Sequence, residues 1–89
     1  MKDNMRIGVV NMRAISGNTT ANMETILANI EESAAQNVDL VLLPELCLQG
    51  YDFFVEEGIS REEKLSVGEG IDGACCNILQ EAAIRTKQY

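Results

Sequence analysis

A short apolar run that stops at a proline most constrains the fold of this chain. Residues 40–43 are four consecutive apolar residues, and Pro44 follows at once. A run of this length without polar alternation is typical of a strand that needs cover on both faces, as in parallel sheets. Proline has no N–H to donate to a sheet, so the strand is expected to end there. Glu45 is therefore predicted to lie at the carboxyl end of a buried strand, where open α/β sheets place their chemistry.

Two earlier segments make this run part of a β-α-β unit. Residues 5–12 are short and rich in β-branched side chains, which favours a strand. Between residues 19 and 36 the apolar residues take a helical spacing; the stripe consists of Met23, Ile26, Leu27, Ile30 and Ala34. Asn18 is expected to cap the start of this helix, and Asn37 to adopt a left-handed conformation after its end. With a second strand at residues 38–43, the pattern predicts two parallel strands joined by a right-handed crossover.

The second half of the chain is expected to be a long connection followed by a helix. Residues 46–70 are interrupted by glycines, and residues 60–63 have the form of a capping box that would start one helical turn. Asp72 is expected to cap the last helix. The apolar stripe of that helix is predicted to contain Cys75, Ile78, Leu79 and Ala82, with Ile84 beside it. Nothing indicates a second domain.

Charge and cysteine content exclude several classes of function. The chain has 14 acidic and 7 basic residues, a formal net charge of −7. This balance disfavours binding to nucleic acid and to anionic membrane surfaces. No apolar run approaches membrane-spanning length, and no apolar leader is visible at the amino terminus. The chain has three cysteines, no histidine and no zinc-type spacing, so we expect a reducing cytosol and no metal site.

One block of the sequence carries a family resemblance. Residues 39–51 read Asp-Leu-Val-Leu-Leu-Pro-Glu-Leu-Cys-Leu-Gln-Gly-Tyr. This block resembles the first catalytic motif of the nitrilase, or carbon-nitrogen hydrolase, superfamily. A Pro-Glu pair alone would mean nothing, but here it ends an apolar strand and precedes a Gly-Tyr pair by five residues. The preceding strand, Gly-Asn turn and amphipathic helix also follow in the family's order, so the resemblance extends from about residue 5 to residue 84.

The resemblance implies a fold and a chemistry. It implies that residues 1–89 form a single incomplete domain, a βαβα portion from the amino end of a nitrilase-type α-β-β-α sandwich. The parallel strand pair would carry its helices on one face. Family enzymes act on non-peptide carbon-nitrogen bonds of small molecules such as amides and nitriles through a Glu-Lys-Cys triad, without a cofactor. Glu45 matches the general base. Lys2, Lys64 and Lys87 match no position of the family's lysine.

The cysteines do not match the family's nucleophile either. Cys75 and Cys76 come before the place where the family's third strand would start, and we interpret them as structural. Cys47 lies two residues after a potential base, which a nucleophilic thiol needs. In an extended segment, however, residues i and i+2 are about 7 Å apart, too far for direct proton transfer. Catalysis by Cys47 is therefore not expected.

Two functional interpretations stay open. The first is part of a carbon-nitrogen hydrolase that carries only Glu45 and is inactive alone. The second is a stand-alone, non-catalytic remnant or assembly module. In either case one face of the small sheet would lack the family's second sheet, so we expect a homo-oligomer. Residues 51–54 hold three of the few aromatics; they either border the substrate pocket or pack beneath the loop.

Overall fold

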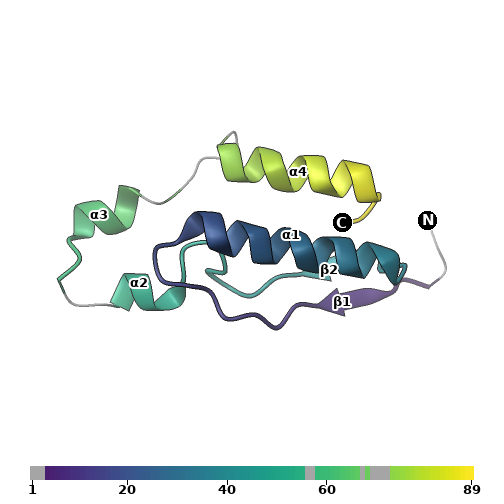
Figure 1. The fold of residues 1–89 in the computed structure, drawn as a ribbon, viewed down its shortest axis with the longest axis horizontal. Helices are drawn as coiled ribbons and strands as arrows, with labels where there is room; N and C mark the ends of the chain where they lie inside the picture. Colours follow the sequence, from purple (N-terminus) through teal and green to yellow (C-terminus); the bar gives the residue numbers. More distant parts are fainter. Residues whose placement is uncertain (1–3, 56–57, 67, 69–72) are drawn as a thin grey trace.

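The computed structural model of the chain describes residues 4–55, 58–66, 68 and 73–89. Its elements are, in chain order, β1 (Ile7–Val9), α1 (Thr19–Ala35), β2 (Leu40–Leu42), α2 (Tyr51–Val55), α3 (Arg61–Ser66) and α4 (Ala74–Thr86). The two strands are parallel, with Ile7 opposite Leu40 and Val9 opposite Leu42 (Figure 1). The predicted α/β class and the parallel strand pair are confirmed.

Both ends of α1 are formed as the sequence predicts. The side chain of Asn18 accepts a hydrogen bond from the backbone N–H of Ala21 at 3.1 Å. Asn37 has a φ of 59°, in the left-handed region that asparagine tolerates better than most residues. These two residues set the length of the helix, so the chain leaves α1 already turned towards β2.

The core lies between the helices and one face of the sheet. Its buried members are Met23, Ile26 and Ile30 from α1 and Ala82 from α4. Val41 from β2 packs against this cluster, so both long helices cover the same face of the strand pair. Figure 1 shows α4 lying alongside α1. The ion pair between Arg85 and Glu31 also joins these two helices.

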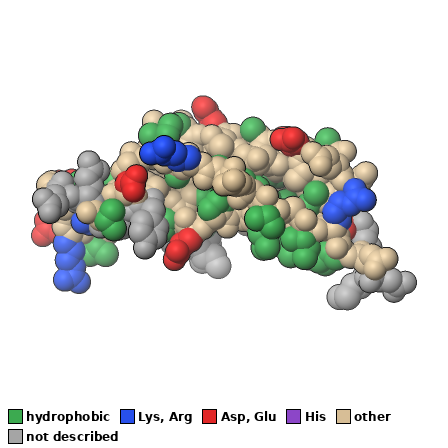
Figure 2. Space-filling view, turned by 90° about the horizontal axis from the view of Figure 1, so that it is seen from below, with side chains coloured by type: hydrophobic (Ala, Val, Ile, Leu, Met, Phe, Trp, Pro, Cys, Tyr) green, Lys and Arg blue, Asp and Glu red, His purple; other side chains and the backbone are tan. Residues whose placement is uncertain are grey.

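The opposite face of the strand pair is open. Alternation along the strands directs Ile7, Val9 and Leu42 away from the helices, and these side chains are 53%, 77% and 47% exposed. Figure 2 views the molecule from below, with hydrophobic side chains gathered on that side. The apolar run at residues 40–43 is thus covered on one face only in this chain.

The carboxyl-terminal residues lie along the other edge of β2. The N–H of Tyr89 donates to the carbonyl of Asp39, and the carbonyl of Tyr89 accepts from the N–H of Val41, both at 2.9 Å. This is the alternation of a parallel ladder. The N–H of Leu40 points the other way, to Arg6, so β2 is paired on both edges.

Some sequence predictions about elements were wrong. Both strands are shorter than predicted, and the connection at residues 46–70 contains the helices α2 and α3. The capping box does start α3: the hydroxyl of Ser60 accepts from the N–H of Glu63 at 3.1 Å. A helix was not expected at α2 because tyrosine, phenylalanine, aspartate and valine are mediocre helix formers.

The predicted apolar stripe of α4 was too wide. Ile78 is 39% exposed, because α4 packs on one side only, against α1. The residue that precedes α4 as its N-cap is Gly73; the predicted cap, Asp72, lies outside the described residues. No helix in the described parts of the chain is both long and apolar enough to cross a membrane.

Candidate functional site

Glu45 lies exposed in a turn that follows β2, beside a hollow of about 240 Å³. The lining comes from the segment after β1, from the segment after β2 and from α2. Its residues are Met12, Arg13, Ala14, Pro44, Glu45, Leu46, Cys47 and Asp52. Because the carboxyl ends of parallel strands meet at the same end of a sheet, these two segments come together there. The structure places Glu45 at this end of β2, as predicted, in an exposed position.

The backbone is strained directly after Glu45. Leu46 has a φ of 54°, a left-handed conformation that costs a non-glycine residue roughly 1–2 kcal/mol. The turn is closed by a hydrogen bond of 2.8 Å from the N–H of Gly50 to the carbonyl of Leu46. Strain of this kind persists only where surrounding contacts over-determine the conformation, and it is concentrated at functional sites.

Two charged residues that the sequence did not indicate share the hollow with Glu45. Arg13 follows β1, and Asp52 lies in the first turn of α2. The hollow therefore presents one cation and two carboxylates within a small space. Arg13 could have been found by asking which polar residue follows the neighbouring parallel strand. Asp52 could not, because the helix that carries it was not expected.

Comparison with known families concerns the chain as a whole. The family model of carbon-nitrogen hydrolases matches residues 6–89, nearly all of the chain. The chain belongs to the carbon-nitrogen hydrolase family. No curated protein and no solved structure matches it. The family resemblance noted on residues 39–51 is thereby confirmed, and the α/β arrangement around Glu45 is that of a carbon-nitrogen hydrolase portion.

Cys47 lines the same hollow of this carbon-nitrogen hydrolase chain, but its surroundings are those of a packing residue. It is half-buried and packs against the core cluster. Burial raises the pKa of the Cys47 thiol, and a hydrogen bond with its own backbone lowers it by less. A thiol with a raised pKa stays protonated at neutral pH and is a poor nucleophile. The extended spacing assumed from the sequence was wrong, because residues 45–49 form a turn.

The other two cysteines lie on α4, away from Glu45. Cys75 packs against the core, and Cys76 lines a different hollow. None of the three cysteines forms a disulfide. Within the described ranges, no group of carboxylates, thiols or imidazoles is arranged to hold a metal ion.

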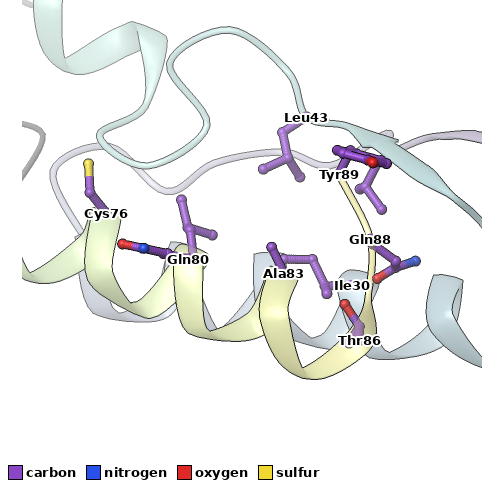
Figure 3. A pocket seen from close by; sticks show the side chains of 10 residues that line it. Ile30, Leu43, Cys76, Gln80, Ala83, Thr86, Gln88 and Tyr89 are labelled. Atoms are coloured by element: carbon purple, nitrogen blue, oxygen red, sulfur yellow. The ribbon is translucent and has the colours of Figure 1, made fainter.

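A second hollow, of about 440 Å³, lies between α4 and β2 (Figure 3). Leu43 and Tyr89 stand on one side of it, and side chains of α4 such as Cys76 and Ala83 stand on the other. Its lining contains neither a carboxylate nor a cation, and it shares no residue with the hollow at Glu45. Charged side chains therefore line the smaller hollow and not this one.

Proposed function

We propose that these residues supply the general base, Glu45, of a site that acts on non-peptide carbon-nitrogen bonds of small amides or nitriles. One observation supports this most directly. Glu45 follows Pro44 at the carboxyl end of a parallel strand, beside a charged hollow, in a chain matched to the carbon-nitrogen hydrolase family over residues 6–89. A solvent-exposed carboxylate at that edge of the sheet can exchange protons with a substrate in the hollow.

The proposed role of Glu45 follows from the family's Glu-Lys-Cys triad. With an amide substrate, the glutamate takes the proton of the cysteine thiol as the sulfur attacks the carbonyl carbon. It then returns that proton to the departing nitrogen, which leaves an acyl thioester for water to hydrolyse. The lysine stabilises the charge on the tetrahedral intermediate. No described residue of this chain takes the lysine or the nucleophile role, so Glu45 is its one contribution to the triad.

We propose accordingly that residues 1–89 do not hydrolyse amides by themselves. Members of such a triad act as a unit, so a base without its nucleophile gives little rate enhancement. The purified chain should show background turnover with a panel of small amides and nitriles. Turnover above background that disappeared in Cys47→Ala would show that Cys47 is the nucleophile after all.

The role of Glu45 is testable when these residues replace the matching portion of an active carbon-nitrogen hydrolase. In that chimera, Glu45→Gln should lower kcat by about a hundredfold or more, because general acid-base catalysis contributes about 10²–10⁴-fold. Glu62→Gln, an equal change on exposed α3, is the matched control and should leave kcat unchanged. An unchanged rate in Glu45→Gln would reduce Glu45 to a structural residue.

We further propose that a second copy of the chain covers the open sheet face. The described side chains on that face, Ile7, Val9, Leu40 and Leu42, are all apolar. These side chains carry no charge that would repel the same face of a second chain. In a dimer with two-fold symmetry, the apolar faces of the two chains would therefore pack against each other. The exposed apolar face is the observation that favours an assembly role as the second candidate function. We also propose a reducing cytosol for the chain, which is compatible with three cysteines that form no disulfide.

Sedimentation equilibrium at micromolar concentration tests the self-association. We expect a dimer or larger species for the native chain and a monomer for Val9→Lys, which puts a charge on each copy of the face. Leu65→Lys is the control, because Leu65 is 68% exposed on α3 and lies off the face. A native chain that stays a monodisperse, cooperatively melting monomer would contradict the proposal.

A further inference from the structure

Among the described residues, two polar side chains are buried, those of Asn22 and Gln88, and Asn22 is the more enclosed. Asn22 of α1 is 1% exposed and packs beside the buried stripe of that helix. Asparagine is a weak helix former, and burying an amide without partners is costly. A buried asparagine at the end of the first turn of α1 therefore needs an explanation, and its hydrogen bonds supply one.

The Asn22 amide is satisfied by the backbone of two separate segments. Its Oδ1 accepts from the N–H of Ile15 at 2.7 Å, and its Nδ2 donates to the carbonyl of Ile15 at 2.8 Å. The same Nδ2 donates to the carbonyl of Leu48 at 2.7 Å. Ile15 belongs to the segment after β1 that carries Arg13, and Leu48 to the turn after β2 that carries Glu45. One side chain thus fastens both walls of the candidate site to α1.

The two segments also bind each other directly. The N–H of Gly17 donates to the carbonyl of Gln49 at 2.8 Å. Gly50 lies so close that a Cβ there would be 3.0 Å from the Cα of Ser16. The segments therefore pack backbone against backbone, and the amide of Asn22 closes the same junction from the helix side. This junction lies at the end of the turn that begins with strained Leu46.

We infer that Asn22 is a positioning residue for Glu45. It holds the turn at residues 45–49 against the segment after β1, keeps Leu46 in its left-handed conformation and so keeps the Glu45 carboxylate at the hollow. The chemical purpose of this placement rests on the proposed function. The placement itself is a property of the chain without substrate, so the two can be tested separately.

Nuclear magnetic resonance on the chain itself gives the test. Asn22→Asp keeps the size of the side chain and the acceptor for the Ile15 N–H, but removes the donor to the carbonyls of Ile15 and Leu48. We expect the backbone chemical shifts of Leu46 to lose their left-handed signature. We also expect the Gly17 amide to exchange with solvent roughly tenfold to a hundredfold faster, as the loss of a buried hydrogen bond implies. Amides within α1 should keep their native exchange.

Asn29→Asp is the matched control. Asn29 lies two turns further along α1, and its Nδ2 donates only within the helix, to the carbonyl of Thr25 at 2.8 Å. This variant loses a helical side-chain donor of the same kind, yet should leave the Leu46 shifts and the Gly17 exchange unchanged. A folded Asn22→Asp variant with native Leu46 shifts would overturn the inference, and so would an equal change in Asn29→Asp.

Two further measurements keep the test decisive if Asn22→Asp does not fold. In the native chain, a scalar coupling across the hydrogen bond should connect Nδ2 of Asn22 with the carbonyl carbon of Leu48, and its absence would overturn the inference. In the chimera, Asn22→Ser should lower kcat more than it changes KM, whereas a loss of folded protein alone would leave the kcat of the surviving enzyme intact. If Glu45→Gln had no effect on kcat in the chimera, the proposed function would be wrong. The chemical shifts of Leu46 would still decide whether Asn22 positions the turn.

Discussion

The side-chain amide of Gln88 donates a hydrogen bond to the hydroxyl of Ser33, 55 residues earlier, at 3.0 Å. The same nitrogen donates to the carbonyl of Val38 at 2.8 Å. Gln88 is 8% exposed, so these bonds are made in a dry environment. They tie the end of α4 to the end of α1 and to the start of β2, beside the backbone pairing of Tyr89.

Gln88→Ala should therefore destabilise the fold. The change leaves the carbonyl of half-buried Val38 without its side-chain donor, and an unsatisfied group shielded from water costs about 1–3 kcal/mol. Gln80→Ala, a change at an exposed glutamine of α4, should alter the free energy of unfolding by less than about 0.5 kcal/mol. Urea unfolding followed by circular dichroism measures both. Equal midpoints for the two variants would show that the buried amide adds no stability.

Ile26→Ala should remove the centre of the core. Ile26 is fully buried, at 0% exposure, and isoleucine-to-alanine changes in such positions cost about 2–5 kcal/mol. A domain of this size has little stability in reserve, so we expect the variant to unfold at a much lower urea concentration. Ile84→Ala removes the same atoms from a side chain that is 70% exposed, and its midpoint should stay close to the native one. If Ile26→Ala unfolded at the same urea concentration as the native chain, the core would not be centred on Ile26.

Asn37 offers a test of backbone conformation alone. Its φ of 59° brings the Cβ close to the following carbonyl oxygen, a contact that asparagine tolerates better than alanine. Asn37→Ala should therefore lower the free energy of unfolding by about 1 kcal/mol. Asn37→Gly should be close to neutral, because glycine adopts this conformation without strain. Thermal melts of the two variants distinguish them. If alanine and glycine behaved alike, the end of α1 would not depend on the left-handed turn.

Cys47 should make stability fall at high pH. Burial raises the pKa of its thiol, so between the unfolded and folded pKa values the folded chain binds a proton that the unfolded chain has lost. The contribution of Cys47 is then complete below pH 9.0, the ordinary value of the thiol, and is lost as the pH rises past it. We expect urea midpoints between pH 7 and pH 10 to fall more steeply in the native chain than in Cys47→Ala. If the urea midpoints of the two proteins fell equally with pH, burial would not raise the pKa of the Cys47 thiol.

The local and periodic features of this fold could be predicted from the sequence. Asn18 and Asn37 bound α1 because each acts on the backbone within a few residues of itself. The parallel strand pair followed from the change of apolar period on either side of that helix. Glu45 was placed at the correct end of β2 because Pro44 marks where a strand must stop.

Features made by contacts between distant segments could not be predicted. Asn22 and Leu48 are 26 residues apart, so nothing local in the sequence shows that the Asn22 amide meets the turn beside Glu45. The left-handed Leu46 gives no sequence signal either, since leucine has no preference for that conformation. Arg13 and Asp52 join the site only once the two strand ends and α2 have been brought together.

The register of Ile7 with Leu40 also bears on the order in which the chain folds. The two strands are three residues each and far apart in the chain, so pairing them costs loop-closure entropy that a few ladder hydrogen bonds do not repay. A formed α1 spans much of that separation and brings the strands close before they pair. We therefore expect the helix and its contacts to belong to the folding nucleus, and the sheet, with the turn that carries Glu45, to be completed after the rate-limiting step.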